Sequence, residues 1–128
     1  MSWLFEDERD DVSVAMAVEV RERGAAVPVL FRWETQSALI ASVRQKRISY
    51  EQAVTHLHSF DKLHLRPDEF IANASFSTGF DLARRFALTP YDAAYIELSL
   101  RTSLPLMTRD KKLASVAAEL NFLWAAPE

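Results

Sequence analysis

Hydrophobic and polar positions along the chain follow two patterns, one typical of amphipathic helices and one typical of short buried strands. Helical spacing between capping and stop residues predicts helices over residues 10–23, 31–46, 49–60, 69–86, 90–101 and 110–120. Short apolar runs between them predict strands over residues 27–30, 63–65, 104–108 and 121–124. Strands that alternate with helices indicate a three-layer α/β domain, with a short, mostly parallel sheet flanked by helices.

Several helix ends are marked by residues that start or stop helices. Gly24 is expected to end the first helix, because glycine readily adopts the backbone conformation that follows a last turn. Ser49 and Gln52 have the spacing of a capping box. Thr89 precedes a proline and is expected to cap the helix that begins there, and Asp110 opens the last helix.

The same patterns predict which side chains are buried. Val14 and Val18 are expected on the apolar side of the first helix, and Trp33 is expected in the core. Glu97 and Arg101 are expected on a solvated helix face. The helix over residues 69–86 is expected to break at residues 75–79, which are rich in serine, threonine and glycine.

Composition narrows the class of protein. A chain of 128 residues, about half of them apolar, is expected to form a single domain over residues 1–128. There is no cysteine, which excludes a thiol nucleophile and cysteine-based zinc sites, and two glycines are too few for a phosphate-binding loop. We find no secretory signal and no membrane-spanning segment, so a cytoplasmic protein is the expectation. The net charge of −3 argues mildly against tight, non-specific nucleic-acid binding unless a metal ion supplies positive charge.

Three acidic residues lie early in predicted helices and next to apolar columns: Glu34, Asp92 and Asp110. Taken singly, each has an ordinary explanation as a favourable charge or an N-cap at a helix start. Taken together, Glu34 and Asp110 follow strands directly, and strand ends of a parallel sheet lie along one edge. Three carboxylates at one edge would repel each other unless a cation such as Mg²⁺ or Mn²⁺ neutralised them, and phosphodiester hydrolysis is the reaction class that such a site favours.

Two segments then resemble a known family. Thr-Pro-Tyr-Asp-Ala-Ala-Tyr-Ile-Glu-Leu-Ser-Leu-Arg at residues 89–101 and Leu-Pro-Leu-Met-Thr-Arg-Asp-Lys-Lys-Leu at residues 104–113 closely resemble the C-terminal half of PIN-domain proteins of the VapC toxin type. Val-Pro-Val-Leu-Phe-Arg-Trp-Glu at residues 27–34 resembles the second strand of that family and the acid that follows it. The resemblance covers nearly the whole chain.

The resemblance implies a metal-dependent endoribonuclease that acts as the toxin of a toxin–antitoxin pair. It implies that Glu34, Asp92 and Asp110 are three of four acidic residues that hold Mg²⁺ or Mn²⁺, and that Thr108 supports the site by hydrogen bonding. Many members have an asparagine where this chain has Ser37. The expected partners are an RNA substrate, a cognate antitoxin and a second copy of the chain in a homodimer, with no membrane partner.

The start of the chain departs from the family. Trp3-Leu4-Phe5-Glu6-Asp7-Glu8 resembles the region just after the first strand of the family, so the chain is expected to be N-terminally truncated, without that strand and its aspartate. One hypothesis is a true start upstream of Met1. The alternative is a catalytically inactive, truncated PIN-like protein that acts only through antitoxin binding or self-association. A DNA-directed nuclease is a further alternative, because nothing in the sequence reads a 2′-hydroxyl.

Overall fold

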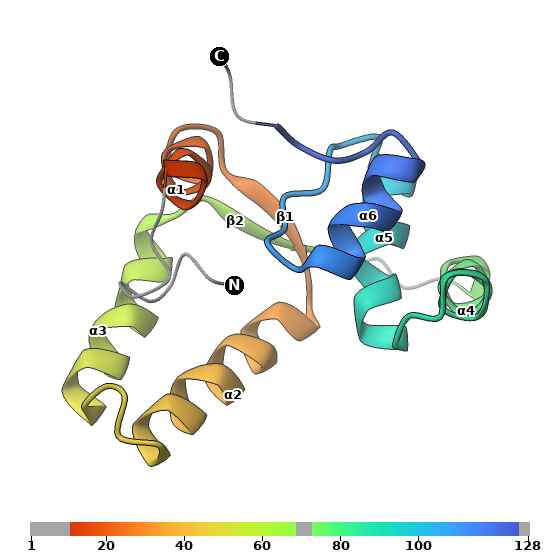
Figure 1. Ribbon diagram of the computed structural model, residues 1–128. Coiled ribbons are helices and arrows are strands. Elements are labelled where there is room, and N and C mark those ends of the chain that lie inside the picture. Colours follow the sequence, from red (N-terminus) through yellow and green to blue (C-terminus); the bar gives the residue numbers. More distant parts are fainter. Residues whose placement is uncertain (1–10, 69–72, 126–128) are drawn as a thin grey trace. The chain divides into compact units, whose positions relative to one another are not determined.

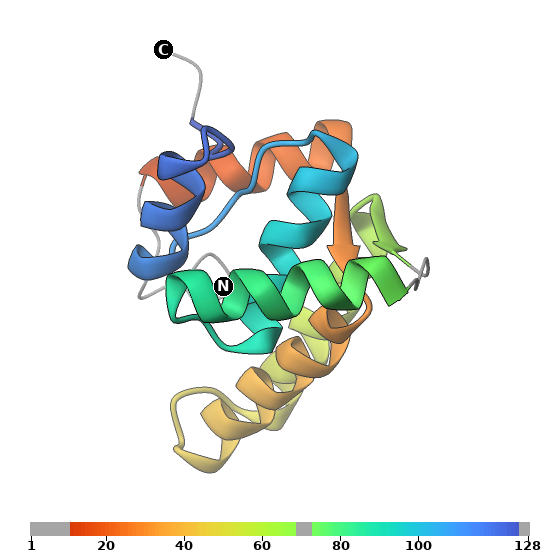
Figure 2. The same ribbon diagram turned by 90° about the vertical axis from the view of Figure 1, so that its right-hand side faces the viewer.

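The computed structural model describes residues 11–68 and 73–125, which form a mixed α/β fold (Figures 1 and 2). Within these ranges the elements are α1 (Asp11–Arg23), β1 (Ala25–Pro28), α2 (Leu30–Arg44), α3 (Tyr50–Ser59), the 3₁₀ turn η3 (Phe60–Lys62), β2 (Leu65–Asp68), α4 (Asn73–Phe86), α5 (Pro90–Thr102) and α6 (Lys111–Glu119). β1 and β2 pair as a two-stranded parallel sheet. The predicted α/β class is therefore confirmed. The described chain divides into two compact units, an N-terminal unit that ends at Pro67 and a C-terminal unit that begins at Asp68.

The N-terminal unit depends on a close backbone approach at Gly24. Gly24 has a φ of 75°, and its N–H donates to the Val20 carbonyl at 2.8 Å, so it ends α1 as predicted. A Cβ atom at this position would lie 2.4 Å from the carbonyl oxygen of His64. The next residue, Ala25, donates its N–H to that same oxygen at 2.9 Å. Glycine is thus required both for the turn and for the approach of the two chain segments that lead into β1 and β2.

In the N-terminal unit, α2 and α3 form an antiparallel helical pair joined by a short turn (Figure 1). Phe31 of α2 meets Phe60 edge to face, with ring centroids 5.9 Å apart. Among residues 14–23 of α1, Met16 and Val20 are buried, whereas Val14 and Val18 are exposed, so the predicted apolar side of α1 was wrong. Trp33, predicted in the core, is 69% exposed. The apolar residues of α1 satisfy more than one helical spacing, and only the neighbouring elements decide which spacing faces the core.

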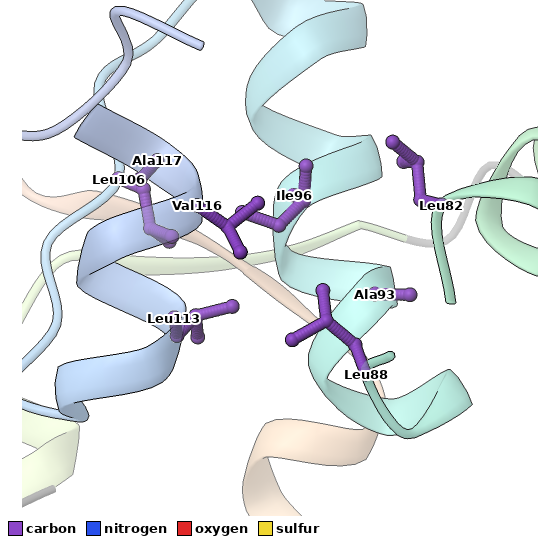
Figure 3. Close-up of a cluster of buried hydrophobic side chains, with 8 residues drawn as sticks. All are labelled: Leu82, Leu88, Ala93, Ile96, Leu106, Leu113, Val116 and Ala117. Carbon is purple, nitrogen blue, oxygen red and sulfur yellow. The ribbon is translucent and has the colours of Figure 1, made fainter. Parts of the chain in front are cut away.

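The C-terminal unit has one contiguous aliphatic core (Figure 3). Its buried members come from α4, the turn after it, α5, the segment before α6, and α6 itself: Leu82, Leu88, Ala93, Ile96, Leu106, Leu113, Val116 and Ala117. α4 and α5 pack against each other. α4 runs unbroken through Gly79, contrary to the predicted break, because packing of its apolar face outweighs the weak helix propensity of residues 75–79.

Strand boundaries differ most from the prediction. β1 begins and ends two residues earlier than expected, and β2 begins at the last residue of its predicted strand and continues to Asp68. The predicted strands over residues 104–108 and 121–124 reduce to one parallel bridge between Leu106 and Leu123. Pro105 has no N–H to donate, which limits the pairing to the bonds of Leu106. Within the described ranges, no helix has both the length and the apolar character that crossing a membrane requires.

Candidate functional site

Asp92 lies in the first turn of α5, at a helix start that the sequence predicts well. The Thr89 hydroxyl oxygen accepts a hydrogen bond from the Asp92 N–H at 3.1 Å, and Pro90 occupies the first helical position. The Asp92 side chain is half-buried, and its carboxylate has no hydrogen-bond or ion-pair partner within the described part of the chain. The backbone N–H groups at the start of α5 favour a negative charge here. The Thr89 cap therefore fixes the Asp92 backbone, and the Asp92 carboxylate is not used by another described side chain.

Asp110 is the N-cap of α6. Its Oδ1 accepts a hydrogen bond from the Leu113 N–H at 2.8 Å, and its own N–H donates to the Thr108 hydroxyl oxygen at 3.1 Å. One carboxylate oxygen is used by the cap, which leaves the second for a ligand. The Thr108 hydroxyl thus contacts the backbone of Asp110 directly.

Asp92 and Asp110 are carried by helices that pack on the same core. Ala93 follows Asp92 directly, and Leu113 receives the cap of Asp110; both belong to the buried cluster. In Figure 3, Leu113 on α6 and Ala93 on α5 lie on opposite sides of the cluster, facing the same core. The two carboxylates are therefore carried by helices that share one core.

Glu34 belongs to the other unit. It lies at the start of the second turn of α2, because α2 begins at Leu30, one residue earlier than predicted. α2 begins without a side-chain cap, since Val29 already has helical dihedral angles. Glu34 is half-buried and lies in the turn before the buried Leu39.

The four predicted residues are thus divided between the units, with Glu34 in the N-terminal unit and Asp92, Thr108 and Asp110 in the C-terminal unit. Within the described residues of either unit, no three histidine, aspartate or glutamate side chains gather as a metal site. The donors of the C-terminal unit are carboxylate and hydroxyl oxygens, which are the ligands that Mg²⁺ and Mn²⁺ prefer. The residues present fit such an ion in kind.

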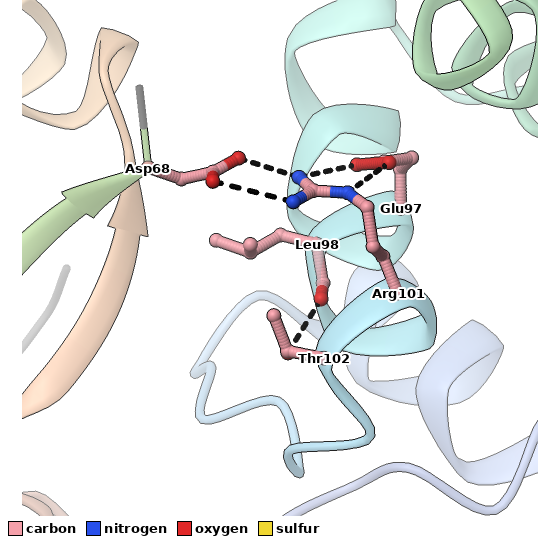
Figure 4. A network of polar contacts seen from close by, with 5 residues as sticks. All are labelled: Asp68, Glu97, Leu98, Arg101 and Thr102. Atoms are coloured by element: carbon pink, nitrogen blue, oxygen red, sulfur yellow. Dashed lines mark hydrogen bonds and ion pairs between the residues drawn. The ribbon is translucent and has the colours of Figure 1, made fainter. Parts of the chain in front are cut away.

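The sequence prediction missed a polar network in α5 (Figure 4). Arg101 donates to both carboxylate oxygens of Asp68, at 3.2 and 2.5 Å, and to Glu97 at 2.7 Å. The Glu97 side chain is only 9% exposed, so its predicted solvated position was wrong. Hydrogen bonds with Glu97 and then Asp68 raise the pKa of the Arg101 guanidinium above its already high ordinary value. The spacing of Glu97 and Arg101 is visible in the sequence, but their bond to Asp68, 33 residues away, is not.

Comparison with known proteins identifies the family. Residues 1–119 match the PIN domain, and the chain therefore belongs to the PIN domain family, whose members are typically metal-dependent nucleases. The fold is similar to that in the crystal structure of PAE2754 from Pyrobaculum aerophilum, with a TM-score of 0.62 and 21% sequence identity over 85% of this chain and 82% of that one. No curated protein matches the chain.

Proposed function

We propose that the protein is a metal-dependent endoribonuclease and the toxin component of a toxin–antitoxin pair. The observation that supports the nuclease proposal is the similar placement of Asp92 and Asp110 within the C-terminal unit. Each lies at the N-terminal end of a helix, both helices pack on one core, and the Asp92 carboxylate has no partner within the described residues. Membership of the PIN family supplies the reaction class.

In this proposal, Glu34, Asp92 and Asp110 hold Mg²⁺ or Mn²⁺. When bound, the metal supplies Lewis-acid activation of the scissile phosphate and of water. The α5 and α6 N-termini present backbone N–H groups that stabilise negative charge on the carboxylates and on an incoming phosphate. Asp110 is held in one rotamer by its bond to the Leu113 N–H, and Thr108 holds the Asp110 backbone. Such orientation is what a metal ligand needs to keep the ion in a fixed place.

The toxin role rests on the resemblance of residues 89–101 and 104–113 to VapC-type proteins. An antitoxin that silences the nuclease, and a homodimer, are the partners that this role requires. Co-expression with the product of the neighbouring small gene tests the antitoxin partner directly. We expect the two proteins to co-purify and the nuclease to be inhibited; separate elution with full activity would contradict the toxin role.

The nuclease proposal is tested by incubating the purified chain with a mixed RNA pool in Mn²⁺, in Mg²⁺ and in EDTA. We expect cutting with either metal and none with EDTA. Glu34→Gln, Asp92→Asn and Asp110→Asn remove charge at constant size, and each is expected to slow cleavage by at least about 100-fold, the upper end of what outer-shell changes cause at metal sites. The matched control is Asp61→Asn, an exposed carboxylate in η3 outside the proposed site, which is expected to cleave like the parent.

Two results would contradict the proposal. One is a parent protein that is folded by circular dichroism but leaves RNA intact in both metals; that result would favour an inactive PIN-like protein. The other is an Asp110→Asn variant as fast as the parent. A single-stranded DNA pool run in parallel distinguishes a ribonuclease from a DNA-directed nuclease.

A further inference from the structure

The turn between α4 and α5 is short and closely determined. Ala87 has a φ of 53°, in the left-handed region that favours glycine, and the Leu88 N–H donates to the Ala83 carbonyl at 2.9 Å. The Leu88 side chain is buried in the core (Figure 3). Thr89 follows as the N-cap of α5. Three residues therefore connect the two helices, and a left-handed alanine persists only where surrounding contacts hold it.

Lys112 supplies one of those contacts from another helix. Its Nζ donates a hydrogen bond to the carbonyl oxygen of Ala87 at 2.5 Å. Lys112 lies two residues after Asp110, and Ala87 lies five residues before Asp92. The bond thus connects the first turn of α6, where Asp110 is the cap, to the turn that leads into α5, where Asp92 lies.

Lys112 makes this bond from an unfavourable position in its helix. A cation in the first turn of a helix is disfavoured by the helix dipole. Lys111 has the same disadvantage and, like Lys112, is exposed, but its side chain has no partner among the described residues. Of these two adjacent lysines, only Lys112 has a specific hydrogen bond. The acceptor is the carbonyl of Ala87, whose backbone is in the left-handed region.

We propose that Lys112 is a positioning residue: by holding the Ala87 carbonyl it fixes the α5 start relative to the α6 start, and so fixes Asp92 relative to Asp110 for metal binding. This inference rests on the proposed function, because it assumes that the two carboxylates share a metal ion. It assigns Lys112 no contact with substrate or metal. Outer contacts of this kind typically change metal affinity by roughly 10- to 100-fold when they are removed.

The experiment measures Mn²⁺ binding to the full chain by electron paramagnetic resonance of free Mn²⁺, without RNA. Lys112→Met keeps an unbranched apolar stem and removes the terminal donor, and we expect about tenfold weaker binding. Lys111→Met is the matched control, because it removes the same charge from the same helix end without removing a bond. We expect the control to stay within about twofold of the parent, and Lys112→Arg to restore most of the affinity because it keeps a cationic donor.

Hydrogen exchange gives a second readout that separates positioning from general stability. Loss of the Lys112 bond is expected to speed amide exchange over residues 87–93 only. A merely structural contribution would speed exchange throughout α5 and α6, and that result would overturn the proposal. Should Lys112→Met fail to fold by circular dichroism, Lys112→Gln decides in its place, because its shorter side chain lacks the reach to Ala87.

The outcomes distinguish this inference from the function on which it rests. Mn²⁺ binding that is lost in Asp92→Asn and Asp110→Asn but kept at parental strength in Lys112→Met would overturn the positioning role alone. A parent chain that binds no Mn²⁺ and cuts no RNA would overturn both proposals. Weaker binding in Lys112→Met, normal binding in Lys111→Met and local exchange at residues 87–93 would support the positioning role.

Discussion

The helix that carries Glu34 and the helices that carry Asp92 and Asp110 begin in different ways. In the C-terminal unit, the Thr89 and Asp110 side chains cap α5 and α6. Thr89 lies three residues before Asp92, and Asp110 is itself the cap of its helix. In the N-terminal unit, α2 begins without a side-chain cap, directly after β1, and β1 in turn follows the backbone approach at Gly24. In the N-terminal unit, backbone geometry thus sets the position of Glu34. In the C-terminal unit, local side-chain hydrogen bonds set the positions of Asp92 and Asp110. Local bonds of the second kind can be recognised in a sequence, whereas the first kind depends on residues far apart.

Adding a methyl group at Gly24 is the strongest test of whether the N-terminal unit depends on backbone geometry. Gly24→Ala puts a Cβ atom 2.4 Å from the His64 carbonyl oxygen and forces alanine into the left-handed region. We expect a loss of about 3 kcal/mol in the free energy of unfolding, from the unfavourable backbone conformation and the clash together. Urea denaturation followed by circular dichroism measures it.

Gly79→Ala is the matched control in the C-terminal unit. A Cβ atom at Gly79 would meet no atom within 4 Å, and Gly79 lies inside α4. We expect the same substitution there to stabilise the protein by about 0.5 to 1 kcal/mol, because glycine inside a helix loses more backbone entropy on folding than alanine does. Equal destabilisation by the two variants would contradict the contrast between the units.

The difference also explains how much of the fold could be predicted. The starts of α3, α5 and α6 were predicted correctly, because Ser49 with Gln52, Thr89 and Asp110 act within their own first turns. Burial of Trp33 was wrong, and the predicted strands around Leu106 and Leu123 reduced to one bridge. Those features depend on which segments meet in three dimensions, and helical or alternating patterns do not specify that.

The Arg101 network tests whether side-chain contacts organise the C-terminal unit over longer distances as well. Arg101→Met removes the partner of Glu97, whose side chain is 9% exposed, and releases Asp68. We expect a loss of about 2 kcal/mol, less than for a fully buried ion pair, because the Arg101 side chain is itself 27% exposed. Urea denaturation monitored by circular dichroism gives the value.

Arg84→Met is the control for that prediction. Arg84 pairs with Asp81 at 3.1 Å, but its side chain is 75% exposed, so its removal is expected to change stability by less than about 0.5 kcal/mol. A double variant, Glu97→Leu with Arg101→Met, is expected to recover part of the lost stability, since it removes the buried unpaired charge. A single Arg101→Met variant as stable as the parent would show that the network contributes little.

The candidate site could be predicted only in part, for the same physical reason. Asp92, Asp110 and Thr108 lie in two short continuous segments that carry the resemblance to the family, so the sequence alone suffices to propose them as site residues. Lys112 and Ala87 are 25 residues apart and share no sequence pattern, so only the structure shows their bond. Asp68 and Arg101 are 33 residues apart, and only the structure shows their bond as well.

The smallest expected effect separates two roles of Asp110. Asparagine caps helices about as well as aspartate, so Asp110→Asn is expected to keep the bond to the Leu113 N–H and to change stability by a few tenths of a kcal/mol at most. Asp110→Ala removes the cap and is expected to lower the free energy of unfolding by about 1 kcal/mol. Both variants remove the negative charge, so both are expected to lose Mn²⁺-dependent RNA cleavage, measured in parallel with urea denaturation. If Asp110→Asn were as unstable as Asp110→Ala, the charge of Asp110 rather than its hydrogen bond would start α6. Electrostatic stabilisation of the helix start, rather than a side-chain hydrogen bond, would then distinguish α6 from α2.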